Sequence, residues 1–207
     1  MNKIIQIISG NKSVDMEMYE LIPINNFAVS KQEVEELEDE QGEWKFGNIT
    51  FTKSAGRLIS YGIYSSYYED TEKDILTSSA HKFFSNAVNK GQVPYPDIYI
   101  AHIEVPVGKA AMIDYDERGF AVFGAEVYPE WQDVVEEIVV KSYYSGIELG
   151  MSHGFYPATV KWDSDGHIIE YISHELSILP VNGKIVKNGK EIKLISASNK
   201  YTSVFVT

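Results

Sequence analysis

The sequence lacks cysteine, long hydrophobic runs and basic charge, and each shortage excludes a class of protein. Its 207 residues contain no cysteine, which excludes a disulfide scaffold, an iron–sulfur or thiolate zinc site and a cysteine nucleophile. Lys and Arg number 18 against 30 Asp and Glu, and a net charge of −12 argues against binding nucleic acid. The apolar runs are too short for a membrane span, and the run 4–8 is too short for a signal peptide. We therefore expect a cytoplasmic protein with no membrane partner.

The composition that remains predicts one folded domain over residues 1–207. A hydrophobic fraction of 44% with 13% aromatic residues is enough for a real core. No internal repeat or low-complexity linker divides the chain. The first 30 or so residues predict one or two short strands, and the segment 33–43 carries seven acidic side chains, typical of a solvated surface.

Two segments predict helices. The first begins near Thr77 or Ser78, good N-cap residues, and ends at Gly91. Between these ends, apolar residues recur at helical spacing from residue 80 to residue 88, and His81 beside a lysine is expected to be exposed. Pro129 opens the second helix, which ends at Gly146.

Strand patterns fill most of the rest of the chain. Residues 98–105, 110–115 and 120–128 predict an antiparallel meander. Residues 147–162 and 167–179, separated by an Asp-Ser-Asp-Gly turn, predict a hairpin. The fold class is therefore α+β, dominated by antiparallel strands with at least two helices packed outside.

Standard catalytic and cofactor motifs are missing. The sequence has no glycine-rich phosphate loop, no Gly-x-Ser-x-Gly elbow and no histidine pair at the spacing of a helical metal site. We therefore expect no cofactor and no metal.

Three segments of the β-rich half nevertheless contain residues that could form a hydrolytic triad. They carry His102, Ser152 and Glu175. A nucleophilic serine needs an adjacent imidazole to accept its proton, and a third group to orient that imidazole and stabilise its charge. Taken alone, the pattern is more typical of a serine in a turn and of a packed or half-exposed histidine on a strand.

The order and context of these segments resemble the prohead, or capsid maturation, proteases of tailed bacteriophages, which are distant relatives of the herpesvirus assemblins. The family motif S-x-G-F is similar to Ser152-His-Gly-Phe155, and the family strand E-[IL]-S-[LVI] is similar to Glu175-Leu-Ser-Ile178. Further similar segments are the acidic stretch 70–74, the strand histidine and Gly-Lys turn at 102–109, and the ending 197–205. The resemblance covers residues 57–207 and leaves 1–56 unassigned.

The resemblance implies a role for each residue of the triad. Ser152 would be the nucleophile, His102 the general base and Glu175 the group that orients the imidazole. The assemblins use a second histidine as the third member, so His174 is the reserve candidate. Neighbouring residues on a strand point to opposite faces, so only one of Glu175 and His174 is expected to face His102.

The resemblance also implies a biological setting. Members of the family cleave scaffold protein, capsid protein and themselves inside the immature capsid, in the cytoplasm of the bacterial host. Scaffold and major capsid protein are thus the implied partners, and helix-mediated dimers of the assemblins leave a homo-oligomer open. The family fold is a barrel-like, mostly antiparallel core surrounded by helices. The competing interpretation is a catalytically inactive phage structural or scaffold-core protein with the same fold.

Overall fold

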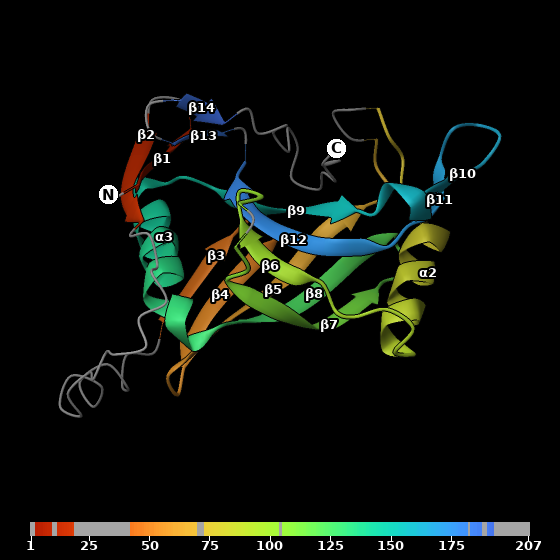
Figure 1. Ribbon diagram of the computed structural model, residues 1–207, viewed down its shortest axis with the longest axis horizontal. Helices are drawn as coiled ribbons and strands as arrows, with labels where there is room; N and C mark the ends of the chain where they lie inside the picture. The colour runs from red at the N-terminus through yellow and green to blue at the C-terminus, as the bar shows by residue number, and fades with distance from the viewer. Residues whose placement is uncertain are drawn as a thin grey trace.

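The computed structural model describes residues 3–9, 12–18, 42–69, 73–103, 105–181, 183–187 and 190–192 (Figure 1). The strands are β1 (Lys3–Ser9), β2 (Lys12–Met18), β3 (Gly42–Phe46), β4 (Ile49–Ser54), β5 (Arg57–Ser66), β6 (Asp97–Ile100), β7 (Gly108–Tyr115), β8 (Phe120–Val127), β9 (Leu149–Phe155), β10 (Lys161–Trp162), β11 (Ile168–Glu170), β12 (Ser173–Pro180), β13 (Gly183–Lys187) and β14 (Lys190–Ile192). The described helices are α2 (Ser78–Asn89) and α3 (Gln132–Ser145), with short 3-10 turns at Pro129–Trp131 and Pro157–Thr159. The predictions for residues 33–41, Asp70 and the segment 197–205 lie outside the described residues. Within those ranges, no helix is long and apolar enough to cross a membrane.

Eight strands form one curled sheet that makes a half-barrel (Figure 1). Their order is β3-β4-β5-β8-β7-β6-β12-β9, and every neighbouring pair is antiparallel except β6 with β12. The predicted meander corresponds to β6, β7 and β8, and the predicted hairpin to the pairs β9–β12 and β10–β11. The α+β class with a barrel-like, mostly antiparallel core is therefore confirmed.

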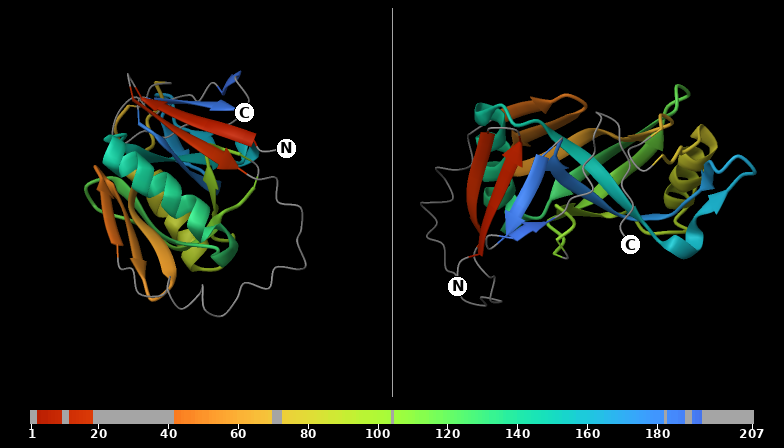
Figure 2. Two further views of the ribbon diagram at one scale, coloured as in Figure 1. Left: turned by 90° about the vertical axis from the view of Figure 1, so that its left-hand side faces the viewer. Right: turned by 90° about the horizontal axis from the view of Figure 1, so that it is seen from above.

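A second, four-stranded sheet joins the two ends of the chain. Its order is β14-β13-β1-β2, so the predicted N-terminal strands are confirmed. β1 pairs antiparallel with β13 over Ile5↔Lys187 to Ser9↔Gly183. Segments almost the whole sequence apart thus lie side by side, as the second view in Figure 2 also shows.

The two described helices lie at opposite ends of the large sheet (Figure 2). Thr77 caps α2 by accepting a hydrogen bond from Ala80 N at 3.2 Å, as its sequence predicts. α3 follows the turn opened by Pro129 and ends at Gly146, whose φ of 64° is a left-handed conformation that glycine adopts without strain. The Lys53–Glu136 ion pair, at 2.6 Å, joins α3 to β4.

Two predictions about individual segments are wrong. The strand expected over 98–105 ends at Ile100, where the chain enters a tight turn. His81, expected to be exposed, is only 1% exposed. It lies three residues before Phe84 and so belongs to the buried stripe of α2, where the hydroxyl of Tyr171 gives its ring a polar partner.

Candidate active site

His102 lies in the turn that follows β6, and not on a strand as the sequence analysis expected. Ala101 and His102 both have positive φ, 52° and 53°, a conformation that residues other than glycine rarely adopt. Such a residue costs roughly 1–3 kcal/mol unless its surroundings compensate. Ile103 N donates to Ile100 O at 3.0 Å and closes the turn. A further contact comes from Ser177, whose Oγ accepts the backbone N–H of His102 at 3.1 Å.

The acid that meets the imidazole is Glu175. Its Oε1 lies 2.5 Å from His102 Nδ1, and the side chain is almost completely buried. An ionised carboxylate can only accept a hydrogen bond, so Nδ1 carries the hydrogen and Nε2 of a neutral ring keeps its lone pair. His174, the reserve candidate, packs its ring against Tyr156 at a centroid distance of 4.6 Å. Of the two neighbours, the structure brings Glu175 to His102.

Gly154 makes room for this carboxylate. It lies directly opposite Glu175 in the β9–β12 pair. A Cβ atom at position 154 would lie 2.8 Å from Glu175 Oε1 and 2.9 Å from its Cγ, closer than such atoms pack. A larger residue there would displace the group that contacts His102. The glycine of the Ser-x-Gly-Phe segment is therefore explained sterically, because only a residue without a side chain leaves room for Glu175.

Ser152 lies on the same face of the sheet. It is directly opposite Ser177, the residue that accepts the N–H of His102. Directly opposite residues of an antiparallel pair have Cα atoms about 4.5–5.5 Å apart and side chains on one face. Ser152 Oγ and His102 Nε2 are both buried and, within the part of the chain that the structure describes, neither has a hydrogen-bond partner. The structure thus gathers all three predicted residues without a hydrogen bond between Ser152 and His102.

A different serine and histidine are hydrogen-bonded in the core behind β9. His153 Nδ1 lies 2.9 Å from Ser173 Oγ, and that hydroxyl donates to Gly154 O at 3.1 Å. Because the hydroxyl gives its proton to a carbonyl, it accepts from the imidazole, the reverse of what a nucleophile needs. The ring of His153 packs edge-on against Tyr64, Phe155 and Tyr171. This pair is therefore part of the packing, and it points away from the face that holds Ser152.

The same buried region contains His81. Its Nδ1 lies 3.0 Å from the hydroxyl of Tyr171, which is 3.1 Å from the hydroxyl of Tyr64. Burial lowers the pKa of His81 to about 4. Burial, and next the charges of His81 and His102, lower the pKa of His153 well below its ordinary value. Both buried rings are consequently neutral at pH 7. We call the group His81, Tyr171, Tyr64, His153 and Ser173 the buried network.

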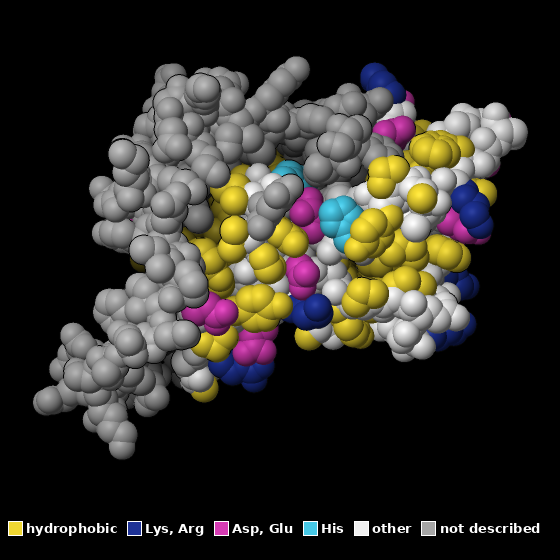
Figure 3. All heavy atoms as spheres, in the orientation of Figure 1, with side chains coloured by type: hydrophobic (Ala, Val, Ile, Leu, Met, Phe, Trp, Pro, Cys, Tyr) yellow, Lys and Arg dark blue, Asp and Glu magenta, His cyan; other side chains and the backbone are white. Residues whose placement is uncertain are grey.

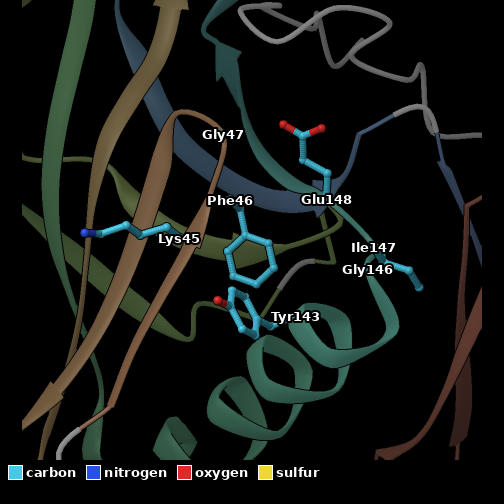
Figure 4. A pocket seen from close by; sticks show the side chains of 7 residues that line it. All are labelled: Lys45, Phe46, Gly47, Tyr143, Gly146, Ile147 and Glu148. Atoms are coloured by element: carbon cyan, nitrogen blue, oxygen red, sulfur yellow. The ribbon is translucent and has the colours of Figure 1, made fainter.

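Two other features do not involve the predicted residues. A hollow of about 210 Å³ lies between the β3–β4 turn and the end of α3, with Phe46, Tyr143 and Glu148 at its wall (Figure 4). In the described ranges, one group could offer metal ligands, Asp163, Asp165 and His167, with ligand atoms within 4.8 Å of one another. Asp163 Oδ1 already accepts the N–H groups of the other two and so shapes their turn.

One face of the molecule mixes charged and apolar side chains. On the face shown in Figure 3, histidine and acidic side chains lie together and are bordered by hydrophobic ones. Comparison of the chain with protein-family models, curated proteins and solved structures found no match. Sequence reasoning missed two residues of the site, the support from Ser177 and the space at Gly154. Both residues lie within the segments 152–155 and 175–178 that resemble the family motifs, and this resemblance was the signal that could have revealed them.

Proposed function

We propose that this chain is a serine endopeptidase in which Ser152 is the nucleophile, His102 the general base and Glu175 the orienting acid. The observation that carries the proposal is the His102–Glu175 contact of 2.5 Å, made in a strained turn above the face that holds Ser152. Consecutive strained residues of this kind are typical of functional sites, where the surrounding structure holds them in place.

The chemistry follows from which atoms have protons. Glu175 holds the hydrogen on His102 Nδ1, so Nε2 can accept the proton of Ser152 Oγ while this oxygen attacks the scissile carbonyl carbon. The carboxylate then stabilises the imidazolium, which gives the same proton to the leaving amine as the carbon–nitrogen bond breaks. Water, deprotonated by Nε2, attacks the acyl-enzyme. The acyl–oxygen bond then breaks, the imidazolium returns the proton to Ser152 Oγ, and the acid is released. Before these steps can occur, Ser152 Oγ must approach His102 Nε2, either by a rotation about χ1 of Ser152 or by a small movement of the turn that holds His102.

We further propose the setting that the resemblance implies. The substrates would be the scaffold and the major capsid protein of a tailed phage, with self-cleavage, inside the immature capsid in the host cytoplasm. The half-barrel of mostly antiparallel strands is compatible with an assemblin-like fold. Support for this part is the order of the motif segments along residues 57–207.

One observation favours the second candidate, an inactive structural or scaffold-core protein with the same fold. Ser152 is completely buried and makes no hydrogen bond to His102. A substrate carbonyl can reach Oγ only if atoms above it move aside. An inactive protein would keep this closed arrangement.

Covalent labelling separates the two candidates. The wild-type chain and Ser152→Ala are incubated with a fluorophosphonate probe, and the modified peptide is identified by mass spectrometry. The protease predicts a single adduct at Ser152 in the wild type and none in S152A. Ser173→Ala, which removes the serine that is hydrogen-bonded to His153, is the matched control and should still be labelled. Lack of an adduct at Ser152 in a folded wild-type chain would rule the protease out.

Incubation with scaffold and capsid protein of a tailed phage tests the substrates. Cleavage by the wild type, and none by S152A, is expected. Labelling at Ser152 without cleavage of either protein would keep the hydrolase and reject these substrates.

A further inference from the structure

We infer that Ser177 is a positioning residue that holds the imidazole of His102 over Ser152. This inference deepens the proposed function and rests on it for its catalytic consequence. Ser177 is wholly buried on β12, and its hydroxyl accepts the backbone N–H of His102 at 3.1 Å. It therefore joins the backbone of the general base to the strand pair carrying the nucleophile, whereas Glu175 contacts the ring.

The backbone of the turn explains why such a contact is needed. Ala101 and His102 are consecutive residues with positive φ, at positions where hairpin turns of this kind prefer Asn and Gly. Their side chains favour negative φ, so the turn relaxes unless other groups hold it. Two contacts to β12 resist relaxation, from Ala101 N to Ile178 O at 2.9 Å and from His102 N to Ser177 Oγ. The first uses the backbone and survives substitution, whereas the second depends on the serine hydroxyl.

The strand register places this contact next to the proposed nucleophile and the proposed orienting acid. Ser177 is opposite Ser152, and Glu175 lies two residues earlier on the same face of β12. The turn is thereby held at its backbone by Ser177 and at its ring by Glu175. A backbone shift at His102 would change the distance from Nε2 to Ser152 Oγ, and misplacement of about 1 Å can cost roughly 100-fold in rate.

The experiment measures the labelling rate at Ser152 for four chains: wild type, Ser177→Ala, Ser177→Ala with Ala101→Gly, and Ser60→Ala. Ser60 is the matched control, because it is a completely buried strand serine whose hydroxyl has no partner among the described residues. We expect S177A to label about 10–100-fold more slowly, and S60A to label at the wild-type rate. Glycine at 101 removes the preference for negative φ and should restore part of the rate to S177A.

A second readout does not depend on catalysis. The Nδ1 proton of His102, hydrogen-bonded to Glu175, should give a low-field proton resonance in the wild-type chain. In S177A this resonance should shift or broaden, and the A101G change should bring it back toward its wild-type position. S60A should leave it unchanged.

The outcomes distinguish this inference from the proposed function. If S177A is labelled at the wild-type rate and its His102 Nδ1 proton resonance is unchanged, Ser177 does not position His102, and the proposed protease function still stands. If the wild type is not labelled but S177A moves the resonance, the positioning stands and the protease fails. If S177A unfolds, Ser177→Thr keeps the hydroxyl and decides the question. A folded S177T that loses the resonance would overturn the inference.

Discussion

Among the described residues, a cluster around His153 and a cluster around His102 lie on opposite sides of β9, and the two imidazoles make different hydrogen bonds. In the buried network, His153 donates to a serine whose own proton goes to a carbonyl, and aromatic rings surround it. At the candidate site, His102 donates to a carboxylate, whereas its Nε2, like those of His81 and His153, has no partner in the described structure. The backbone is strained at the second cluster, at Ala101 and His102.

This difference teaches that a hydrogen bond between serine and histidine does not identify a nucleophile. The Ser173–His153 bond is well formed, yet its direction and enclosure make it structural. The Ser152 and His102 side chains make no such bond, but the buried acid at Nδ1 and the strained turn are those of a general base. Four variants or conditions would break or sharpen the comparison.

Glu175→Gln should have the largest effect. The neutral amide can donate as well as accept, so it no longer fixes the hydrogen on Nδ1, and it has no charge to stabilise an imidazolium. In a well-studied serine protease the equivalent change costs about 10⁴-fold. We expect labelling at Ser152 to fall at least about 1,000-fold, with the fold retained. His174→Gln is the matched control and should label like the wild type. Equal losses in the two variants would remove the distinction between these neighbours.

Acid should weaken the fold through the buried network. The pKa of His81 is about 4 in the folded protein and about 6.5 in an unfolded chain. Between these values the unfolded chain binds more protons, so the free energy of unfolding falls as the pH falls from about 6.5 to about 4, by up to about 3 kcal/mol. Urea denaturation at several pH values measures this. His81→Asn, which retains a polar group for Tyr171, should reduce this pH dependence and leave the part that the lowered pKa of His153 causes. An unchanged profile would exclude His81 as a cause.

Gly154→Ala should impair the candidate site by displacing Glu175. The added methyl group meets the carboxylate at 2.8 Å, so the contact with His102 must lengthen. We expect labelling to slow by about 10–100-fold. Gly124→Ala is a suitable control, since its Cβ would lie at an ordinary 3.5 Å from Met112. A G154A chain that labels as fast as G124A would refute the steric role.

Tyr171→Phe should give the smallest effect, confined to stability. It removes the hydroxyl that lies between Tyr64 and His81, so each of these buried side chains loses a hydrogen-bond partner. The free energy of unfolding should fall by about 1–3 kcal/mol. Labelling at Ser152 should not change, because the network faces away from it. A large loss of labelling in folded Y171F would show that the two clusters act as one functional unit.

Local signals predicted the helices and most strands, and long-range contacts decided the rest. Thr77 and Gly91 flank the two ends of α2 as expected, because capping depends only on residues within a few positions of a helix end. The end of β6 was not predictable, since Ala101 and His102 carry no turn signal and the contacts that hold them come from β12. The parallel β6–β12 pair, between segments about 75 residues apart, also has no local signature.

The candidate site was predicted in part for the same reason. The alternation rule indicated that only one of Glu175 and His174 could face His102, but it could not choose between them. The choice depends on a register shift between Ser173 and Glu175, which is visible only in the paired strands. The burial of His81 was missed because its polar partner, Tyr171, lies 90 residues away.

The pairing of β1 with β13 constrains how the chain can be shortened. The boundary at residue 56, where the motif resemblance begins, falls in the turn between β4 and β5. A fragment starting at residue 57 would leave β5 with one open edge and β13 without β1. Unpaired edges of this kind template association between molecules, so such a fragment would aggregate before its chemistry could be assayed.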